Sequence, residues 1–485
     1  RRGPLPRAPR PRRSLTYTVL TYTGRVITSL AAAVETVRSR GAHGRLPPGP
    51  PAPAAVQTAL WIRTPISFIR RARARYGETF TMRLVGMPPF VSLSTPDAIK
   101  AVFTGPSDDL HAGEANAVLE PILGEHSVLL LDGPRHMRQR RLLLPPFHGQ
   151  RMRQYGETMR DLTLASMAGW PRGEVFSVHA HTQAITLDVI LRTVFGMEDG
   201  AALTQLRARL SELLEGVSNP LLLVPAFRVD LGPRTPGGRL RRCLEEVDRI
   251  LFAQIRERRA EGRSDREDVL SMLVEATDEN GERMLEQELR DELMTLLLAG
   301  HETTATSLAW TLHRLIRHPE ALARLQAELD EAFPDDEIDP DAVRELKWLD
   351  AVIKETLRLN PVVPLVGRGL QRPMELGGVA QPADVVAVPN IYLTHRNPDI
   401  WPEPDRFDPT RFLDAKPSPY TFFPFGGGVR RCIGMAFALY EMQVVLATVL
   451  RHLTPEAAPG VDIRLVRRSV TFAPSDGMPV IIRPR

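Results

Sequence analysis

Residues 425–434 read Phe425-Gly-Gly-Gly-Val-Arg-Arg-Cys432-Ile-Gly434 and stand directly before an apolar stretch with helical periodicity. A cysteine thiolate is a good ligand for heme iron and pushes electron density onto the metal. Glycines let the backbone pass close to a flat cofactor and aim amide N–H groups at the sulfur. Arg430 can reach a carboxylate of the cofactor from the same loop. This arrangement predicts a heme-thiolate site with Cys432 as the iron ligand.

Each part of this stretch has a more ordinary explanation when it is taken alone. A lone cysteine is more often a buried apolar residue at a helix start than a metal ligand. A glycine-rich loop can also cradle a phosphate, but no Lys-Ser or Lys-Thr pair follows these glycines. The joint occurrence of Phe, Gly, Arg, Cys and Gly at fixed offsets favours the heme loop.

The stretch resembles the heme-binding loop of the cytochrome P-450 superfamily, and the resemblance runs from about residue 46 to the C-terminus. The family pattern Phe-x-x-Gly-x-Arg-x-Cys-x-Gly is matched by Phe425, Gly428, Arg430, Cys432 and Gly434. The resemblance implies a mostly α (α+β) fold with small β-sheets, in which heme b lies between a long central helix and the cysteine loop. It also implies that the cofactor is held in part by Phe425, Gly426, Arg430 and Gly434. The chain is most similar in style to bacterial members that oxidise lipids and terpenes.

The bulk composition indicates one globular unit in a reducing compartment. The chain has 485 residues, of which 43% are hydrophobic and 25% charged, and it shows no internal repeat. We therefore expect a single domain over residues 46–485. Only two cysteines, Cys243 and Cys432, are present, so we expect no disulfide framework. We therefore expect a cytoplasmic location.

The first 45 residues differ from the rest in charge and composition. They carry ten arginines and one glutamate, a net charge of +9, so the other 440 residues sum to −5. That distribution argues against nucleic-acid binding by the main body. The Pro/Arg-rich start predicts disorder. Residues 14–37 contain Arg25 and many hydroxyls, which excludes a membrane span but leaves open an organelle transit peptide or a helix lying on a membrane surface.

Apolar periodicity predicts a mainly helical chain after one small β-hairpin. Alternating apolar residues and turn residues over Phe80–Leu93 indicate the hairpin. Residues 361–425 are rich in Pro and Gly and predict loops and short strands. Helical periodicity covers residues 152–168, 203–214, 240–259, 284–317, 319–332, 346–359 and 433–453.

The central helix carries an acid and hydroxyls inside an apolar stretch, Leu296–Thr304. Taken alone, this is a satisfied polar break in a buried helix. Oxygen activation at iron needs protons, and a carboxyl group beside a hydroxyl can relay them. The resemblance to the family motif Ala/Gly-Gly-x-Asp/Glu-Thr implies that Glu302 is the proton-relay acid and Thr303 the oxygen-stabilising alcohol.

Two further motifs concern the heme and the loop that carries the cysteine. Glu355 and Arg358 lie three residues apart on one helix face. The resemblance implies that this pair is buried, that Arg406 joins it, and that all three serve folding and heme retention. It also implies that His136, Arg140 and Arg368 bind heme propionates. Three neighbouring cations are expected to be solvated or to face an electron donor: Arg135, Arg138 and Arg141.

The resemblance places the substrate pocket in aliphatic surroundings formed by Leu298, Ala299, Val362 and Val363, with the run at residues 220–227 near the entrance. We therefore expect a hydrophobic substrate such as a fatty acid or terpene. No flavin or iron–sulfur segment follows Cys432, so a separate ferredoxin or flavodoxin-type donor with its reductase is expected to pass electrons from NAD(P)H, with O2 as co-substrate. We expect a monomer. The alternatives are a heme-thiolate peroxygenase or isomerase, and a non-catalytic heme-binding protein.

Overall fold

The computed structural model describes residues 46–147, 151–198, 200–217, 230, 232, 235–262, 266–468 and 470–485. The predictions for the tail at residues 1–45 and for the apolar run at residues 220–227 lie outside this part of the chain.

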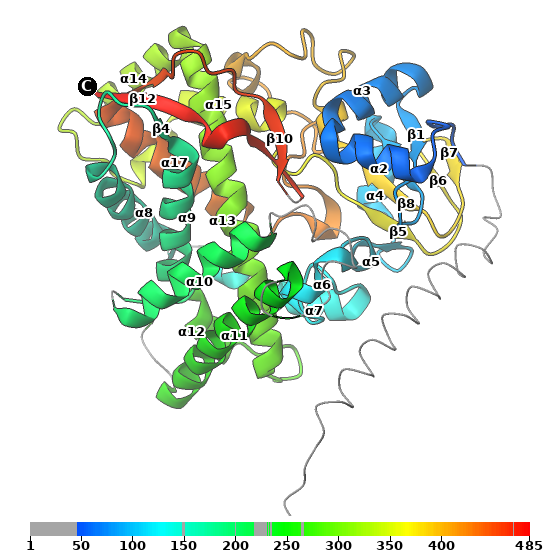
Figure 1. Ribbon diagram of the computed structural model, residues 1–485, viewed down its shortest axis with the longest axis horizontal. Helices are drawn as coiled ribbons and strands as arrows, with labels where there is room; N and C mark the ends of the chain where they lie inside the picture. The colour runs from blue at the N-terminus through cyan, green and yellow to red at the C-terminus, as the bar shows by residue number, and fades with distance from the viewer. Residues whose placement is uncertain are drawn as a thin grey trace, which may run out of the picture.

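One long helix, α13 (Glu286–Arg317), passes through the middle of the protein (Figure 1). At its start the carboxylate of Glu288 accepts the backbone N–H of Leu285 at 2.8 Å and so satisfies a donor that the helix leaves free. The helix ends at Arg317, because Pro319 disfavours helical geometry in the residue before it, His318. Its 32 residues span about 48 Å, which allows one helix to contact most of the other layers.

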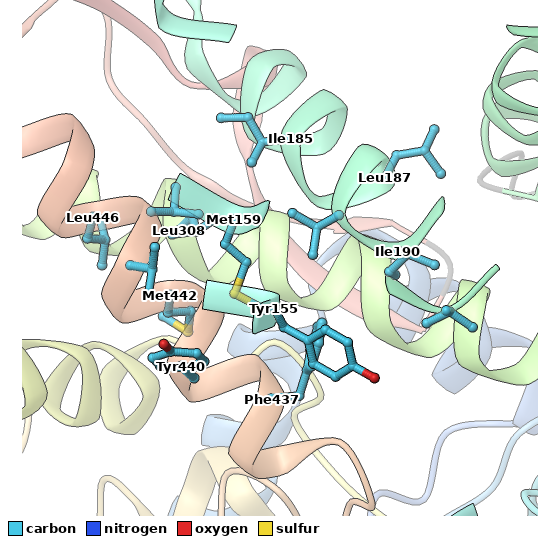
Figure 2. Close-up of a cluster of buried hydrophobic side chains, with 14 of the residues drawn as sticks. Tyr155, Met159, Ile185, Leu187, Ile190, Leu308, Phe437, Tyr440, Met442 and Leu446 are labelled. Carbon is cyan, nitrogen blue, oxygen red and sulfur yellow. The ribbon is translucent and has the colours of Figure 1, made fainter. Parts of the chain in front are cut away.

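Several helices cover α13 and bury most of its surface. The nearest are α9 (Val178–Thr193), α11 (Pro236–Glu261), α15 (Lys347–Leu359) and α17 (Met435–His452). Figure 2 shows part of this core, where side chains of α8 (Arg151–Ala168), α9, α13 and α17 meet. The side chains labelled there are Tyr155, Met159, Ile185, Leu187, Ile190, Leu308, Phe437, Tyr440, Met442 and Leu446.

The predicted helices are present at the expected places, but the sequence interpretation missed α9. Most side chains of α9 are buried, including polar ones such as His179, Thr182 and Thr186. A helix that is covered on more than one side lacks the polar stripe that produces a helical period in the sequence. This helix packs along α13 and, as described below, supplies the partners of Glu302.

A small sheet lies to one side of the helical layers (Figure 1). The predicted hairpin is confirmed as β1 (Thr79–Met82) paired antiparallel with β2 (Phe90–Leu93). The strand β8 (Val386–Pro389) adds to β2 in parallel, and β5 (Arg368–Leu370) adds to β8 antiparallel. The strand β3 (Leu110–His111) pairs antiparallel with β5, so β1 and β3 are the two edge strands. Pairing with β8 on one side and β3 on the other fixes β5, so that Arg368, its first residue, is buried.

The remaining elements complete a mostly helical architecture with small sheets, as the sequence predicts. No helix in the described ranges is both long and apolar enough to cross a membrane. The other helices are α2 (Ala54–Arg63), α3 (Pro65–Tyr76), α4 (Pro96–Thr104), α5 (Ala112–Ala115), α6 (Glu120–Leu123), α7 (Gly133–Leu143), α10 (Ala201–Val217), α12 (Val269–Glu275), α14 (Pro319–Ala332) and α16 (Ile391–Thr394). The other strands are β4 (Phe176–Ser177), β6 (Met374–Leu376), β7 (Val379–Gln381), β9 (Leu453–Ala457), β10 (Leu465–Arg468), β11 (Thr471–Pro474) and β12 (Pro479–Pro484).

The proline-rich segment at residues 46–51 is built into the fold. The backbone N–H of Thr81 donates to the carbonyl of Pro48 at 3.0 Å, and its hydroxyl donates to the carbonyl of Pro47 at 2.7 Å. A side chain at Gly49 would strike the Thr81 carbonyl, so only glycine fits this approach. The segment therefore lies along β1 and marks where fold contacts begin in the described chain.

Deleting residues 1–45 is expected to leave the heme absorption spectrum and the thermal unfolding midpoint unchanged, because their composition cannot support a packed core. Deleting residues 1–52 is expected to lower the midpoint, because Thr81 loses both carbonyl partners, Pro47 and Pro48. Thermal unfolding of the two purified truncations tests this. Loss of heme from the protein that lacks only residues 1–45 would contradict the expectation.

Candidate active site

The loop before α17 holds Cys432 in a fixed backbone conformation. The N–H of Cys432 donates to the carbonyl of Phe425 at 3.0 Å, which closes the loop on itself. Burial raises the pKa of the Cys432 thiol, while a hydrogen bond from the backbone of Gly434 and the charges of Arg140 and Arg431 lower it. The predicted amide donor to the sulfur is therefore that of Gly434, and the loop supplies groups that stabilise a thiolate.

Two glycines of the loop allow a close contact with another part of the protein. A side chain at Gly427 would meet the ring of Phe103 in α4, and one at Gly428 would meet the Phe103 carbonyl at 2.2 Å. Gly428 also has a φ of 64°, which a residue with a side chain rarely adopts. These two glycines therefore let the loop press against α4.

Cys432 lies at the wall of an internal hollow. The residue is exposed, yet burial opposes the ionisation of its thiol. A side chain with both properties is surrounded by protein but faces an empty space. On α13, Ala299 is exposed and Leu298 and Thr303 are half-buried, although most neighbouring positions of the helix are buried. A central helix covered by other helices exposes such positions only toward an internal space.

A cluster of desolvated cations borders this region. Arg368 of β5 donates to the carbonyls of Gly367 at 2.8 Å and Gly427 at 3.4 Å. Burial, with the charge of Arg430 second, lowers its pKa to about 10. Burial likewise lowers the pKa of Arg430 to about 10, and burial lowers the pKa of Arg140 in α7. The carboxylate that faces Arg368 and Arg430 among the described residues is that of Asp132, so the cluster has unbalanced positive charge.

The charge of this cluster fits the group that the sequence predicts. A buried cation is costly unless an anion accompanies it. Heme carries two propionates, whereas Arg368 and Arg430 share the single carboxylate of Asp132 and Arg140 adds a further positive charge. The residues present therefore fit a heme whose propionates reach this cluster.

His136 belongs to the same cluster but carries no charge of its own. The residue is buried in α7, and burial followed by the charges of Arg430 and Arg140 lowers its pKa to about 4. The imidazole is therefore neutral at physiological pH, and it can donate one N–H to an anion.

Asp132 is a site residue that the sequence interpretation missed. Its carboxylate accepts the backbone N–H groups of Ala112 at 2.9 Å, Gly113 at 3.0 Å and Glu114 at 3.3 Å, and it also pairs with Arg430. Arg430 donates further to the carbonyl of Val128 at 3.1 Å. Asp132 thus joins three separate segments. In the sequence Asp132 stands just before a Gly-Pro helix start, a position that predicts a local helix cap and not a link between distant segments.

The three neighbouring cations of α7 are engaged with protein groups. Arg138 pairs with Asp278 at 2.6 Å and Glu288 at 3.1 Å, so of its two predicted roles the solvated cation is wrong and the donor-facing cation stays a prediction. Arg141 forms an exposed pair with Glu279 at 2.8 Å. A guanidinium nitrogen of Arg135 lies 3.3 Å from Nδ1 of His126.

Glu302 and Thr303 are consecutive on α13 but face different surroundings. The Thr303 hydroxyl donates to the Ala299 carbonyl at 2.6 Å. Glu302 instead accepts a hydrogen bond at 2.6 Å from Gln183 of α9 and one at 3.3 Å from Thr306. Burial raises the pKa of Glu302 and outweighs the hydrogen bond from Gln183. The Glu302 carboxyl therefore faces α9, while the Thr303 hydroxyl bonds within α13, and the two side chains form no hydrogen bond with each other.

Glu355 and Arg358 form a fully buried ion pair in α15. The guanidinium donates to the two carboxylate oxygens at 2.6 and 2.7 Å. Arg358 also donates to the carbonyls of His395 and Pro404, both at 2.7 Å, and of Arg406 at 3.1 Å. These hydrogen bonds therefore fix residues 395–406, which precede the Cys432 loop in the chain.

The prediction for the Arg406 side chain is wrong, because only the carbonyl of this residue reaches the pair. Its guanidinium lies at the surface and pairs with Glu403 at 2.9 Å, where the two side chains are 61% and 69% exposed. The cation beside Glu355 is Arg411, whose Nε lies 3.6 Å away and whose side chain is 14% exposed. Arg406 and Arg411 both stand in short Pro-x-Arg-Phe stretches, so the sequence offers two equal candidates and only the fold separates them.

The predicted pocket residues come from two separate segments. Leu298 and Ala299 lie on α13, whereas Val362 and Val363 follow α15. The Val362 carbonyl accepts the N–H of Phe472 in β11 at 2.8 Å, which fixes this second segment. Val362 is buried and Val363 half-buried, so the latter is the better placed of the two to line an open space.

Replacement of Arg358 by Ala is expected to destabilise the protein by about 3–5 kcal/mol, because Glu355 remains buried without its partner. Arg411→Ala is expected to lower stability to a lesser degree. Arg406→Ala, the matched surface control, is expected to leave the free energy of unfolding close to that of the wild type. Denaturant unfolding measures all three, and equal losses for Arg406→Ala and Arg411→Ala would contradict the assignment.

Comparisons with known proteins agree with this site. A family model described as cytochrome P-450 matches residues 47–478. Cytochrome P-450 135B1 of Mycobacterium tuberculosis is 42% identical over 446 residues, which cover 90% of this chain and 91% of that protein. Cytochrome P-450 138 of the same organism is 38% identical over 443 residues, with 91% and 97% covered. The retinoic acid-bound structure of cyanobacterial CYP120A1 superposes with a TM-score of 0.79 at 24% identity, covering 92% of this chain and 99% of that one. The chain therefore belongs to the cytochrome P-450 family and is a heme-dependent monooxygenase.

Proposed function

We propose that the protein inserts one oxygen atom from O2 into a hydrophobic substrate, such as a fatty acid or terpene, with electrons from a separate donor. The observation that carries this proposal is that a half-buried acid of raised pKa, Glu302, directly precedes an alcohol, Thr303, on the stretch of α13 that is open to an internal hollow. Heme-thiolate peroxygenases and isomerases often lack this acid–alcohol pair, which favours the monooxygenase over them.

The heme would be held by groups from four parts of the chain. Cys432 would bind the iron, and His136, Arg140, Arg368 and Arg430 would hold the propionates, while Asp132 pairs with Arg430. When bound, the heme supplies oxygen binding and O–O bond cleavage, which a thiolate ligand favours. The backbone N–H of Gly434 keeps charge on the sulfur by donating to it.

Glu302 and Thr303 would divide the handling of protons. Burial raises the pKa of Glu302, so this acid holds its proton to higher pH than a free glutamate does. The Thr303 hydroxyl donates to Ala299, and on rotation it can donate into the hollow. Because the two side chains do not touch, a proton has to pass between them through a movement of the carboxyl group or through ordered water.

The substrate class follows from the walls of the hollow. Leu298, Ala299 and Val363 offer aliphatic surface, and they present no charge that would select a headgroup. A pocket of this kind takes up apolar molecules because it removes their surface from water.

The remaining partners are proposed on the same basis. A ferredoxin or flavodoxin-type donor, reduced by NAD(P)H through its reductase, would dock on the side of Cys432. We propose a cytoplasmic monomer in which residues 46–485 act as one domain. The largest apolar core supports the single domain, since it extends from Val128 to Ile482.

Thr303→Ala is expected to retain heme and substrate binding but to lose coupling several-fold, with hydrogen peroxide released instead of product. The reason is that the hydroxyl which would hold the reacting oxygen is gone, while little core volume changes. The measurement is product formed per reduced nicotinamide oxidised, with peroxide assayed alongside. A fatty acid and terpene library, screened by shifts of the heme absorption band, supplies the substrate.

The matched control is Thr304→Ala, because Thr304 is buried beside Glu441 and away from the hollow. It is expected to stay coupled. Glu302→Gln is expected to slow turnover without changing the resting spectrum. Full coupling in Thr303→Ala would overturn the acid–alcohol proposal and favour the peroxygenase or isomerase alternative.

A further inference from the structure

The carboxyl group of Glu302 is held by α9 rather than by its neighbour in the motif. Its Oε2 accepts a hydrogen bond from Nε2 of Gln183 at 2.6 Å, the shortest contact that the described residues give it. Its Oε1 accepts one from the Thr306 hydroxyl at 3.3 Å and lies 3.8 Å from Nε2 of His179. Both oxygens are therefore turned toward the interface between α9 and α13.

This position differs from the one that proton delivery requires. Consecutive residues of a helix point about 100° apart, so the Glu302 carboxyl can face α9 while the Thr303 hydroxyl faces the hollow. The Thr303 hydroxyl is occupied by the Ala299 carbonyl at 2.6 Å. The resting arrangement thus separates the acid from the alcohol, and the hydrogen bond to Gln183 is the largest obstacle to bringing them together.

The charged and titratable groups around Glu302 come from α9, α13 and β10. Burial lowers the pKa of His179 to about 3 and that of His301 to about 4, so both imidazoles are neutral. Arg468 of β10 lowers the pKa of Glu302, but less than Gln183 does. The group that most strongly favours the charged carboxylate is therefore an uncharged amide.

We propose that Gln183 is a positioning residue of the proton relay, which holds the Glu302 carboxyl against α9 in the resting protein and releases it for delivery toward Thr303. This inference rests on the relay role of Glu302 in the proposed function. Gln183 itself touches neither heme nor substrate; it acts through Glu302.

A purely structural role for Gln183 is the competing explanation, and a neighbouring residue separates the two. Thr186 lies three residues further along the same face of α9 and also joins α13. Its hydroxyl lies 2.8 Å from Nδ1 of His301 and donates to the His301 carbonyl at 3.2 Å. Thr186→Val removes a contact between the same two helices without touching Glu302, and is therefore the matched control.

The test is an infrared pH titration of the protonated carboxyl band of Glu302 in the substrate-free ferric holoprotein, with the band identified by its loss in Glu302→Gln. Gln183→Met keeps the length of the side chain and removes the donor. A hydrogen bond that stabilises the carboxylate lowers its pKa, so its loss is expected to raise the midpoint by about one to two pH units. Thr186→Val is expected to leave the midpoint unchanged. Gln183→Leu repeats the test if the methionine variant is unstable.

A midpoint in Gln183→Met equal to that of the wild type would overturn the proposal, as would an equal rise in Thr186→Val. The infrared midpoint does not depend on turnover, so it is separate from the test of the relay itself. If Glu302→Gln leaves turnover unchanged, the relay fails whatever the midpoint. If Glu302→Gln slows turnover and the midpoint stays fixed, only the role of Gln183 fails.

Discussion

Burial of the Glu355–Arg358 ion pair constrains the half of the protein that carries the cysteine. Arg358 donates to the carbonyl of His395, and Nε2 of His395 accepts the N–H of Phe423 at 3.0 Å. Two residues later, the carbonyl of Phe425 accepts the N–H of Cys432. Burial and the charge of Arg358 keep the pKa of His395 well below its usual range, so the ring stays a neutral acceptor. These hydrogen bonds, together with the backbone between Phe423 and Phe425, thus connect an ion pair on α15 to the backbone of Cys432.

The Cys432 thiolate and the nearby arginines need partners of opposite charge at the hollow. A thiolate needs donors and nearby positive charge, which Gly434 and Arg140 supply. Arg368 and Arg430 are desolvated and share the carboxylate of Asp132, so within the described part of the chain two guanidinium groups face one carboxylate, and a further anion would balance their charge. A heme would satisfy both demands, because its iron would take the sulfur as a ligand and its propionates would balance the charge of the guanidinium groups. We therefore expect the cofactor to contribute to the stability of the fold as well as to its chemistry.

Much of the fold and the family could be predicted from the sequence, because amphipathic helices and the cysteine pattern are local signals. The failures are of a different kind. Helix α9 was missed because its polar residues are buried against α13, which removes its period. Arg406 was preferred to Arg411 because two similar stretches compete and only packing decides between them. Asp132 and Gln183 contact residues that are far away in the sequence, and the residues next to them in the sequence do not indicate these contacts.

The central claim is that Cys432 holds the heme iron through its sulfur, and the absorption spectrum of the reduced protein with carbon monoxide tests it most directly. Thiolate ligation predicts a strongly red-shifted band in the wild type. Cys432→Ala should abolish this band. Cys243→Ala should keep it, because Cys243 is buried in α11 and donates to the carbonyl of Arg209 at 3.1 Å. Survival of the band in Cys432→Ala, or its loss in Cys243→Ala, would contradict the account.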